Sequence, residues 1–252
     1  MKKIALLGCG RLGRVIANGL LAHAVEGSEL TAVYVRSPEK AAQLRKELSC
    51  SVVTDMQALL AEKPDYVIEA ATGAAVQEYT VSILEAGADL IVLSTSAFGD
   101  PEFYQTALLA TERFDRKIHL AHGVIGGLDA VEAAVLMGSV HTEITKRKFA
   151  RGSGRSDAAL DALDDHFHGT AEDARDKFSE QLNVAVSLGL AVGDLQATGV
   201  HVAPSDRVDF TINCEGTFGN ATFRTELGPS GPDLAAWSAL AMLCRLTSRI
   251  SF

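Results

Sequence analysis

The sequence predicts an α/β protein: an N-terminal doubly wound parallel sheet, a second α+β domain, and a C-terminal helix that returns to the first domain. Three observations predict this class. A short apolar run leads into a Gly-x-Gly-x-x-Gly turn, strand and helix patterns alternate from residue 3 to 121, and the pattern changes after residue 124. We therefore expect a first domain over 1–123 with 232–252, and a second over 124–231.

The opening segment predicts a strand, a tight turn and a helix. Residues 4–7 are all apolar, as in a strand buried on both faces, and three glycines follow at once. Gly8 permits the turn, Gly10 lets a pyrophosphate approach the backbone, and Gly13 lets the helix pack on the strand, as in Rossmann dinucleotide sites. The alternative is a glycine-rich turn that packs a βα unit without a ligand. The residues expected at the cofactor here are Gly8, Gly10, Arg11, Leu12 and Gly13.

The end of the second predicted strand, over 30–35, bears on the choice of cofactor. Sites for NAD usually carry an acidic residue about 20 residues beyond the glycines, where it accepts hydrogen bonds from the ribose. This chain instead has Arg36 and Ser37, with Lys40 one helical turn further on. These groups favour the 2′-phosphate of NADP over NAD. The alternative is that Arg36 stacks on the adenine and Ser37 caps the next helix.

The remaining segments of the first domain continue the alternation. We expect helices over 38–48, 56–61, 76–86 and 101–114, and strands over 51–53, 65–72, 89–93 and 117–121. Because ligands of open α/β sheets lie outside the carboxyl ends of the strands, Ala71 and Thr72 should border the nicotinamide half of the cofactor. His122 follows the last strand and should lie near the same edge.

The second half predicts a sheet with helices. We expect helices over 129–136, 158–163 and 171–192, antiparallel strands over 140–149, 199–203, 209–214 and 219–226, and a Gly/Ser-rich loop over 151–157. The C-terminal helix carries an apolar stripe that predicts packing rather than function. Its members are Leu234, Trp237, Leu240, Ala241 and Cys244.

Composition excludes several classes of function. The 252-residue chain has a net charge of −9 and no basic patch, which argues against nucleic acid as a partner. No apolar run is long enough for a membrane helix and no signal peptide is evident, so we expect a soluble, cytoplasmic protein without a membrane partner. The four cysteines are scattered, and we expect no metal site. His166, His168 and His201 suggest a metal only superficially.

Taken together, these segments resemble the L-aspartate dehydrogenases. The likeness spans nearly the whole chain in the family's order, and GVIGGLD and NVA are more specific than the opening glycines. The segments that carry it are GCGRLG (8–13), EAA (69–71), STSA (94–97), GVIGGLD (123–129), KRK (146–148), FHGTA (167–171), LNVA (182–185), GTFG (216–219) and PS (229–230).

The resemblance implies a catalytic second domain that also forms a homodimer interface, and reversible hydride transfer between a nicotinamide and the α-carbon of aspartate or its imine. It also implies that the backbone at Val124 and the side chain of Asn183 contact the cofactor. One position departs from the family. Counting back eight residues from Phe218 reaches Phe210, where the family has its catalytic histidine, and phenylalanine cannot exchange a proton.

Two other side chains are candidates for the chemistry. His122 could titrate near neutral pH and supply the proton, or it could be satisfied by a backbone carbonyl. Lys148, with Lys146 and Arg147, could hold a carboxylate of an amino-acid or dicarboxylic-acid substrate, or the three could form an exposed, charged strand.

Two classes of function therefore stay open. The first is an NAD(P)-dependent oxidoreductase that acts on the CH–NH2 group of aspartate or of a shifted, less polar substrate. The second is a non-catalytic or regulatory NAD(P)-binding paralogue that kept the glycine turn and lost the acid–base group.

Overall fold

The computed structural model describes residues 1–149, 166–178, 182–228 and 230–250. The chain separates into two compact units: Met1–Ala97 with Pro101–Gly123 and Asp233–Phe252, and Phe98–Asp100 with Val124–Pro232. The loop predicted over 151–157 and the helix predicted over 158–163 lie outside the described residues. None of the described helices has both the length and the apolar character needed to cross a membrane.

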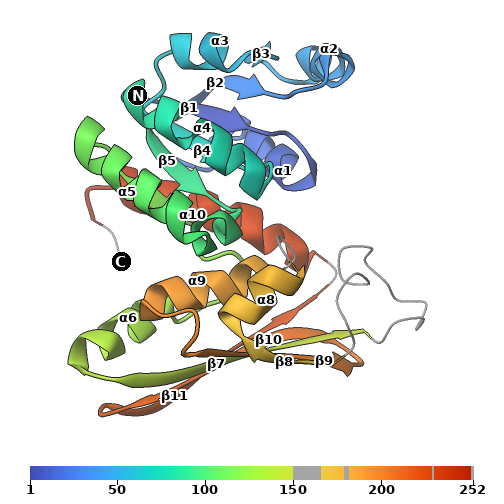
Figure 1. Cartoon of the computed structure of the whole chain (residues 1–252). Helices are drawn as coiled ribbons and strands as arrows, with labels where there is room; N and C mark the ends of the chain where they lie inside the picture. The colour runs from blue at the N-terminus through green and yellow to red at the C-terminus, as the bar shows by residue number, and fades with distance from the viewer. Residues whose placement is uncertain (150–165, 179–181, 229, 251–252) are drawn as a thin grey trace. The chain divides into compact units, whose positions relative to one another are not determined.

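The first unit contains the doubly wound parallel sheet that the sequence predicts (Figure 1). Its strands follow the order β3-β2-β1-β4-β5-β6, and neighbouring strands pair in parallel. The strands are β1 (Lys2–Leu7), β2 (Ser28–Tyr34), β3 (Ser51–Val53), β4 (Tyr66–Glu69), β5 (Asp89–Val92) and β6 (Ile118–Leu120). The helices are α1 (Arg11–Leu21), α2 (Pro38–Glu47), α3 (Met56–Ala61), α4 (Gly73–Glu85), α5 (Pro101–Phe114) and α10 (Leu234–Thr247).

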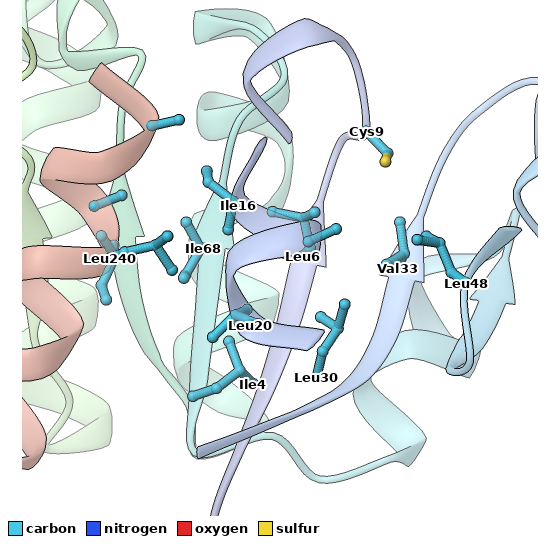
Figure 2. Close-up of a cluster of buried hydrophobic side chains, with 14 of the residues drawn as sticks. Ile4, Leu6, Cys9, Ile16, Leu20, Leu30, Val33, Leu48, Ile68 and Leu240 are labelled. Atoms are coloured by element: carbon cyan, nitrogen blue, oxygen red, sulfur yellow. The ribbon is translucent and has the colours of Figure 1, made fainter. Parts of the chain in front are cut away.

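The core of this unit joins the sheet to helices that are distant in the sequence. Figure 2 shows Ile4 and Leu6 of β1 and Ile68 of β4 packed against α1, with Leu240 of α10 beside them. A Cβ added at Gly19 of α1 would lie 2.6 Å from Cδ1 of Leu240, so the two helices approach closely. The C-terminal helix therefore returns to the first unit, as predicted.

Two details of the first unit differ from the prediction. The strand expected over 65–72 ends at Glu69, because Thr72 accepts a hydrogen bond from the backbone N–H of Ala75 (3.2 Å) and begins α4 at Gly73. The apolar stripe expected on α10 is right only in part: Leu240 is buried and Cys244 packs against the core, but Leu234 is exposed. The residues that this helix buries are Ala236, Ala239, Leu240 and Leu243, whereas Trp237 is 47% exposed. Small alanines on the inner face permit the close approach to α1.

The second unit is a mixed sheet in the order β11-β10-β7-β9-β8, with helices on one face (Figure 1). β7 pairs in parallel with β9, and the other neighbours pair antiparallel. The strands are β7 (Val140–Phe149), β8 (Phe167–Thr170), β9 (Thr198–Ser205), β10 (Val208–Gly216) and β11 (Gly219–Leu227). The helices are α6 (Leu128–Met137), α8 (Ala171–Phe178) and α9 (Asn183–Val192), and η1 (Thr95–Gly99) and η3 (Gly231–Asp233) are 3-10 turns at the boundaries of the units.

This unit also differs from its prediction in three respects. The single helix expected over 171–192 is two helices, α8 and α9, with 179–181 outside the described residues. β7 is antiparallel to β10 as expected, but it is parallel to β9. β8, α8 and α9 lie between β7 and β9 in the sequence, and this long connection lets the chain enter β9 in the direction of β7. β8 itself was not predicted, because its four residues, Phe-His-Gly-Thr, form too short a pattern.

Candidate cofactor and substrate site

The glycine turn after β1 has almost no room for side chains at two of its three positions. Gly8 has a φ of +92°, and its N–H donates to the carbonyl of Tyr34 at 3.0 Å. A Cβ added at Gly8 would lie 2.7 Å from Cβ of Ala71, and one at Gly13 would lie 2.3 Å from the carbonyl oxygen of Gly8. The lack of a side chain at Gly8 therefore lets the turn pack against the segment after β4, and the lack of one at Gly13 lets α1 pack against the turn.

Gly10 differs from the other two, because a Cβ added there would meet no atom within 4 Å. It is the N-cap residue of α1 in an extended conformation, and none of the described side chains caps that helix. The first-turn N–H groups of α1 are thus available to an anion, whose approach is favoured by the helix dipole. Nearby, Arg11 forms an ion pair with Asp233, and Leu12 packs on the core.

The segment after β2 holds both cations and a carboxylate. Arg36 is exposed, and Ser37 accepts a hydrogen bond from the backbone N–H of Lys40 (3.1 Å), so Ser37 does cap α2. The Ser37 hydroxyl also donates to Oε2 of Glu39 at 2.6 Å, and this bond lowers the pKa of the Glu39 carboxyl. Residues 35–37 include no acidic residue, but the structure brings the Glu39 carboxylate from the first turn of α2 back to Ser37.

A buried carboxylate that the sequence analysis did not single out lies at the ends of β4 and β5. Glu69 is fully buried and accepts hydrogen bonds from the N–H groups of Ala71 (2.6 Å), Leu93 (3.2 Å) and Ser94 (2.9 Å), and from the Ser94 hydroxyl (2.9 Å). Burial raises the pKa of the Glu69 carboxyl, and these hydrogen bonds oppose that rise. A charged residue within the otherwise apolar sequence Val67–Ala71 was the available signal.

The other residues predicted at this edge are placed as follows. Ala71 is exposed, and Thr72 uses its hydroxyl to cap α4. His122 is half-buried and lies two residues beyond the end of β6. The next residue, Gly123, donates its N–H to the hydroxyl of Ser238 on α10 at 3.0 Å. The structure thus ties the segment after β6 to the C-terminal helix.

In the second unit, β7 turns alternate residues toward its buried face. Lys146 is 4% exposed and Lys148 is 0% exposed, so the exposed-strand alternative is wrong for both lysines. Arg147 points to the opposite face, where it donates to Asp209 at 2.9 Å. Phe210 lies directly across from Lys146 in the β7–β10 pair, and the Lys146 ammonium lies 5.3 Å from the centre of its ring. Phe210 belongs to the apolar core of this unit.

The remaining predicted residues of this unit lie on different elements. Val124 is half-buried before α6, and Asn183 is the first residue of α9. His168 and His201 are neighbours across the β8–β9 pair with ring centres 4.1 Å apart, and Nε2 of His201 lies 3.0 Å from Oε2 of Glu143. Among the residues that the structure describes, no group of three or more histidines, cysteines and carboxylates is arranged to hold a metal ion.

Both halves of the chain match known protein families. Residues 8–121 match the family described as homoserine dehydrogenase, NAD binding domain, and residues 129–247 match the family described as aspartate dehydrogenase, C-terminal. The L-aspartate dehydrogenase of Methanospirillum hungatei is 33% identical over 98% of this chain and 95% of its own length. This chain belongs to the L-aspartate dehydrogenase family. The corresponding enzyme of Methanothermobacter thermautotrophicus is 30% identical over 98% of this chain and 96% of its own.

Solved structures give the same fold. The aspartate dehydrogenase of Thermotoga maritima superimposes with a TM-score of 0.80 at 24% identity, covering 100% of this chain and 99% of its own. The scyllo-inositol dehydrogenase of Lactobacillus casei, solved with NAD(H), gives a TM-score of 0.64 at 15% identity, covering 97% and 87%. These structures show the fold, and the family match over residues 8–121 identifies the first unit as an NAD-binding domain of the predicted Rossmann class.

The geometry of the first unit fits a nicotinamide dinucleotide. The space left at Gly10, beside the open N-terminus of α1, is where the pyrophosphate of a dinucleotide approaches the backbone. From β1 the chain adds β2 and β3 on one side of the sheet, and it then adds β4, β5 and β6 on the other side. The topological switch point of the sheet therefore lies between β1 and β4. The adenosine half would therefore lie toward β2 and the nicotinamide half toward β4 and β5.

Proposed function

We propose that this family member is an NAD(P)-dependent dehydrogenase that transfers hydride between the nicotinamide and the α-carbon of a small amino acid or its imine. The observation that carries the proposal is an intact glycine cradle in a chain that belongs, over nearly its full length, to the L-aspartate dehydrogenases. When bound, the coenzyme supplies the hydride. The residues of this chain would orient the coenzyme, bind the substrate carboxylates, and donate or accept a proton.

The substrate is proposed to be aspartate or a related, less polar amino acid. Support for the shift comes from Phe210, an apolar ring at the position that the resemblance assigns to the catalytic histidine. His122 is the proposed proton donor and Lys148 the proposed carboxylate ligand. Val124 and Asn183 are proposed contacts of the coenzyme.

We also propose a homodimer, for which light scattering should give twice the mass of one chain; the mass of a single chain would contradict it.

The phosphorylated coenzyme NADP is proposed to bind better than NAD. Arg36 and Lys40 offer two cations to a 2′-phosphate, whereas the Glu39 carboxylate beside Ser37 offers one opposing charge. NADPH and NADH are to be tested with ammonia and a panel of 2-oxo acids that includes oxaloacetate, following absorbance at 340 nm. Ammonia-dependent oxidation with a lower KM for NADPH is expected. A lower KM for NADH would overturn the cofactor preference alone.

A second candidate function is a non-catalytic or regulatory NAD(P)-binding protein. The observation that favours it is the packing of Phe210 into the apolar core of the second unit, which leaves no titratable group at that position. The same assay separates the two. Coenzyme that binds, as seen by its fluorescence, but is not oxidised with any 2-oxo acid would support the non-catalytic protein.

Replacing Lys148 by methionine should raise the KM for a dicarboxylic substrate by about 10- to 100-fold, because a charge-assisted hydrogen bond to the carboxylate is lost. Methionine keeps most of the length and apolar character of this fully buried side chain. KM is to be measured with oxaloacetate, and the coenzyme Kd should stay within about twofold, which shows that the fold is intact.

The matched control is K177M, which makes the same change at an exposed lysine of α8. This variant should leave both constants unchanged. If K148M lowered kcat with oxaloacetate and left the KM unaltered, Lys148 would not be the carboxylate ligand.

A further inference from the structure

Glu69 is an unusual residue for the end of a central strand. It is 0% exposed, and it sits opposite Val92 in the β4–β5 pair, so its carboxylate lies where both strands end. Removing a carboxylate from water is costly unless donors replace the lost water. Here three backbone N–H groups and one hydroxyl do so, from Ala71, Leu93 and Ser94.

The four hydrogen bonds connect two separate segments through one side chain. Oε1 accepts from the Ala71 N–H and the Ser94 hydroxyl, and Oε2 accepts from the N–H groups of Leu93 and Ser94. The segment after β4 is therefore held to the segment after β5 through the Glu69 carboxylate. Because Glu69 fixes the N–H of Ala71, it also sets the path of the chain into Thr72, the N-cap of α4.

The segment that Glu69 holds also packs against the glycine turn. A Cβ added at Gly8 would lie 2.8 Å from the carbonyl oxygen of Ala70 and 2.7 Å from Cβ of Ala71, and one added at Gly13 would lie 3.7 Å from Cβ of Ala70. Residues 70–71 therefore border the turn on the side of β4, and a displacement of their backbone away from the turn would change the space beside it.

We infer that Glu69 is a positioning residue for the nicotinamide half of the coenzyme, which it serves by fixing the Ala70–Ala71 backbone between the glycine turn and the end of β5. This inference rests on the proposed function for the identity of the coenzyme. The adenosine half lies on the β2 side of the switch between β1 and β4, away from the segments that Glu69 joins. The effect of Glu69 should therefore be confined to one half of the ligand.

The test is E69Q, assayed by calorimetry with the coenzyme that the wild-type chain binds more tightly and with its adenosine half, ADP or 2′-phosphorylated ADP. Glutamine has the size of glutamate, but its amide nitrogen cannot accept a hydrogen bond, so either the Ala71 N–H or the pair at Leu93 and Ser94 loses its acceptor. The Kd of the whole coenzyme should rise about 10-fold, and the Kd of the adenosine half should change less than about twofold.

Two further variants keep the test decisive. E85Q removes an exposed carboxylate from α4 and should change neither Kd. S94A keeps Glu69 and its three backbone donors and removes only the hydroxyl, so it should weaken the whole coenzyme about two- to threefold even if E69Q does not fold. Equal losses for the coenzyme and the adenosine half, or no loss in either variant, would overturn the inference. A wild-type chain that binds no nicotinamide coenzyme would overturn the proposed function instead, and this inference with it.

Discussion

Replacing Gly10 by alanine should raise the Kd of the nicotinamide coenzyme by more than about 100-fold, because a methyl group keeps the pyrophosphate away from the backbone and at least two charge-assisted hydrogen bonds are lost. The protein itself should remain folded. Gly10 has a negative φ (−76°) in an extended backbone, and its added Cβ meets no atom within 4 Å. Isothermal calorimetry gives the Kd, and thermal unfolding gives the stability.

Two glycine variants serve as controls for G10A. G13A should unfold at a much lower temperature, because its Cβ would lie 2.3 Å from a backbone carbonyl oxygen. G228A, at a position that is also open, should alter neither binding nor stability beyond about 1 kcal/mol. If G10A bound the coenzyme like the wild-type chain, the pyrophosphate could not lie at this turn.

Replacing Phe210 by histidine should raise ammonia-dependent turnover of oxaloacetate by about 100-fold or more, the usual contribution of a positioned general acid–base group. The resemblance to the family places the catalytic histidine at this position. The new imidazole would lie next to Lys146, whose ammonium now lies over the Phe210 ring. Turnover is to be measured between pH 6 and 9, and the variant should acquire a dependence on a group that titrates near neutral pH.

The matched control for this variant is F210Y, which keeps the ring and its contact with Lys146 but does not titrate near neutral pH. It should turn over no faster than the wild-type chain. The coenzyme Kd of both variants should equal that of the wild-type chain, because Phe210 packs in the apolar core of the second unit and is not among the proposed coenzyme contacts. Unchanged turnover in F210H with intact coenzyme binding would show that position 210 is not where the proton is exchanged.

The first unit was predictable because local signals and the fold agree. Buried parallel strands give continuous apolar runs such as Ile4–Leu7, and Ser37, Asp55 and Thr72 mark helix starts by capping α2, α3 and α4. The predictions that failed concern features that depend on how one element packs against another. The buried face of α10 is set by α1, at Gly19, and no pattern within α10 alone reveals that its alanines lie inside.

The candidate site was predictable to a smaller degree. The glycine turn is recognisable from the spacing of its glycines. A side chain would be blocked at two of the three positions and would meet no atom at the third, Gly10. The Glu69 hydrogen bonds and the return of Glu39 to Ser37 were not foreseen, because each depends on how a side chain folds back on segments nearby in space. The burial of Lys146 and Lys148 depends likewise on which face of β7 the helices cover.

The most direct test of the account is to follow the hydride itself. The wild-type chain is to be incubated with coenzyme deuterated at nicotinamide C4, oxaloacetate or the best 2-oxo acid, and ammonia, and the products analysed by mass spectrometry and NMR. An amino-acid dehydrogenase should place deuterium on the α-carbon of an amino acid, formed only when ammonia is present. Deuterium at C2 of a hydroxy acid without ammonia, or no transfer from coenzyme that is demonstrably bound, would contradict the proposed function.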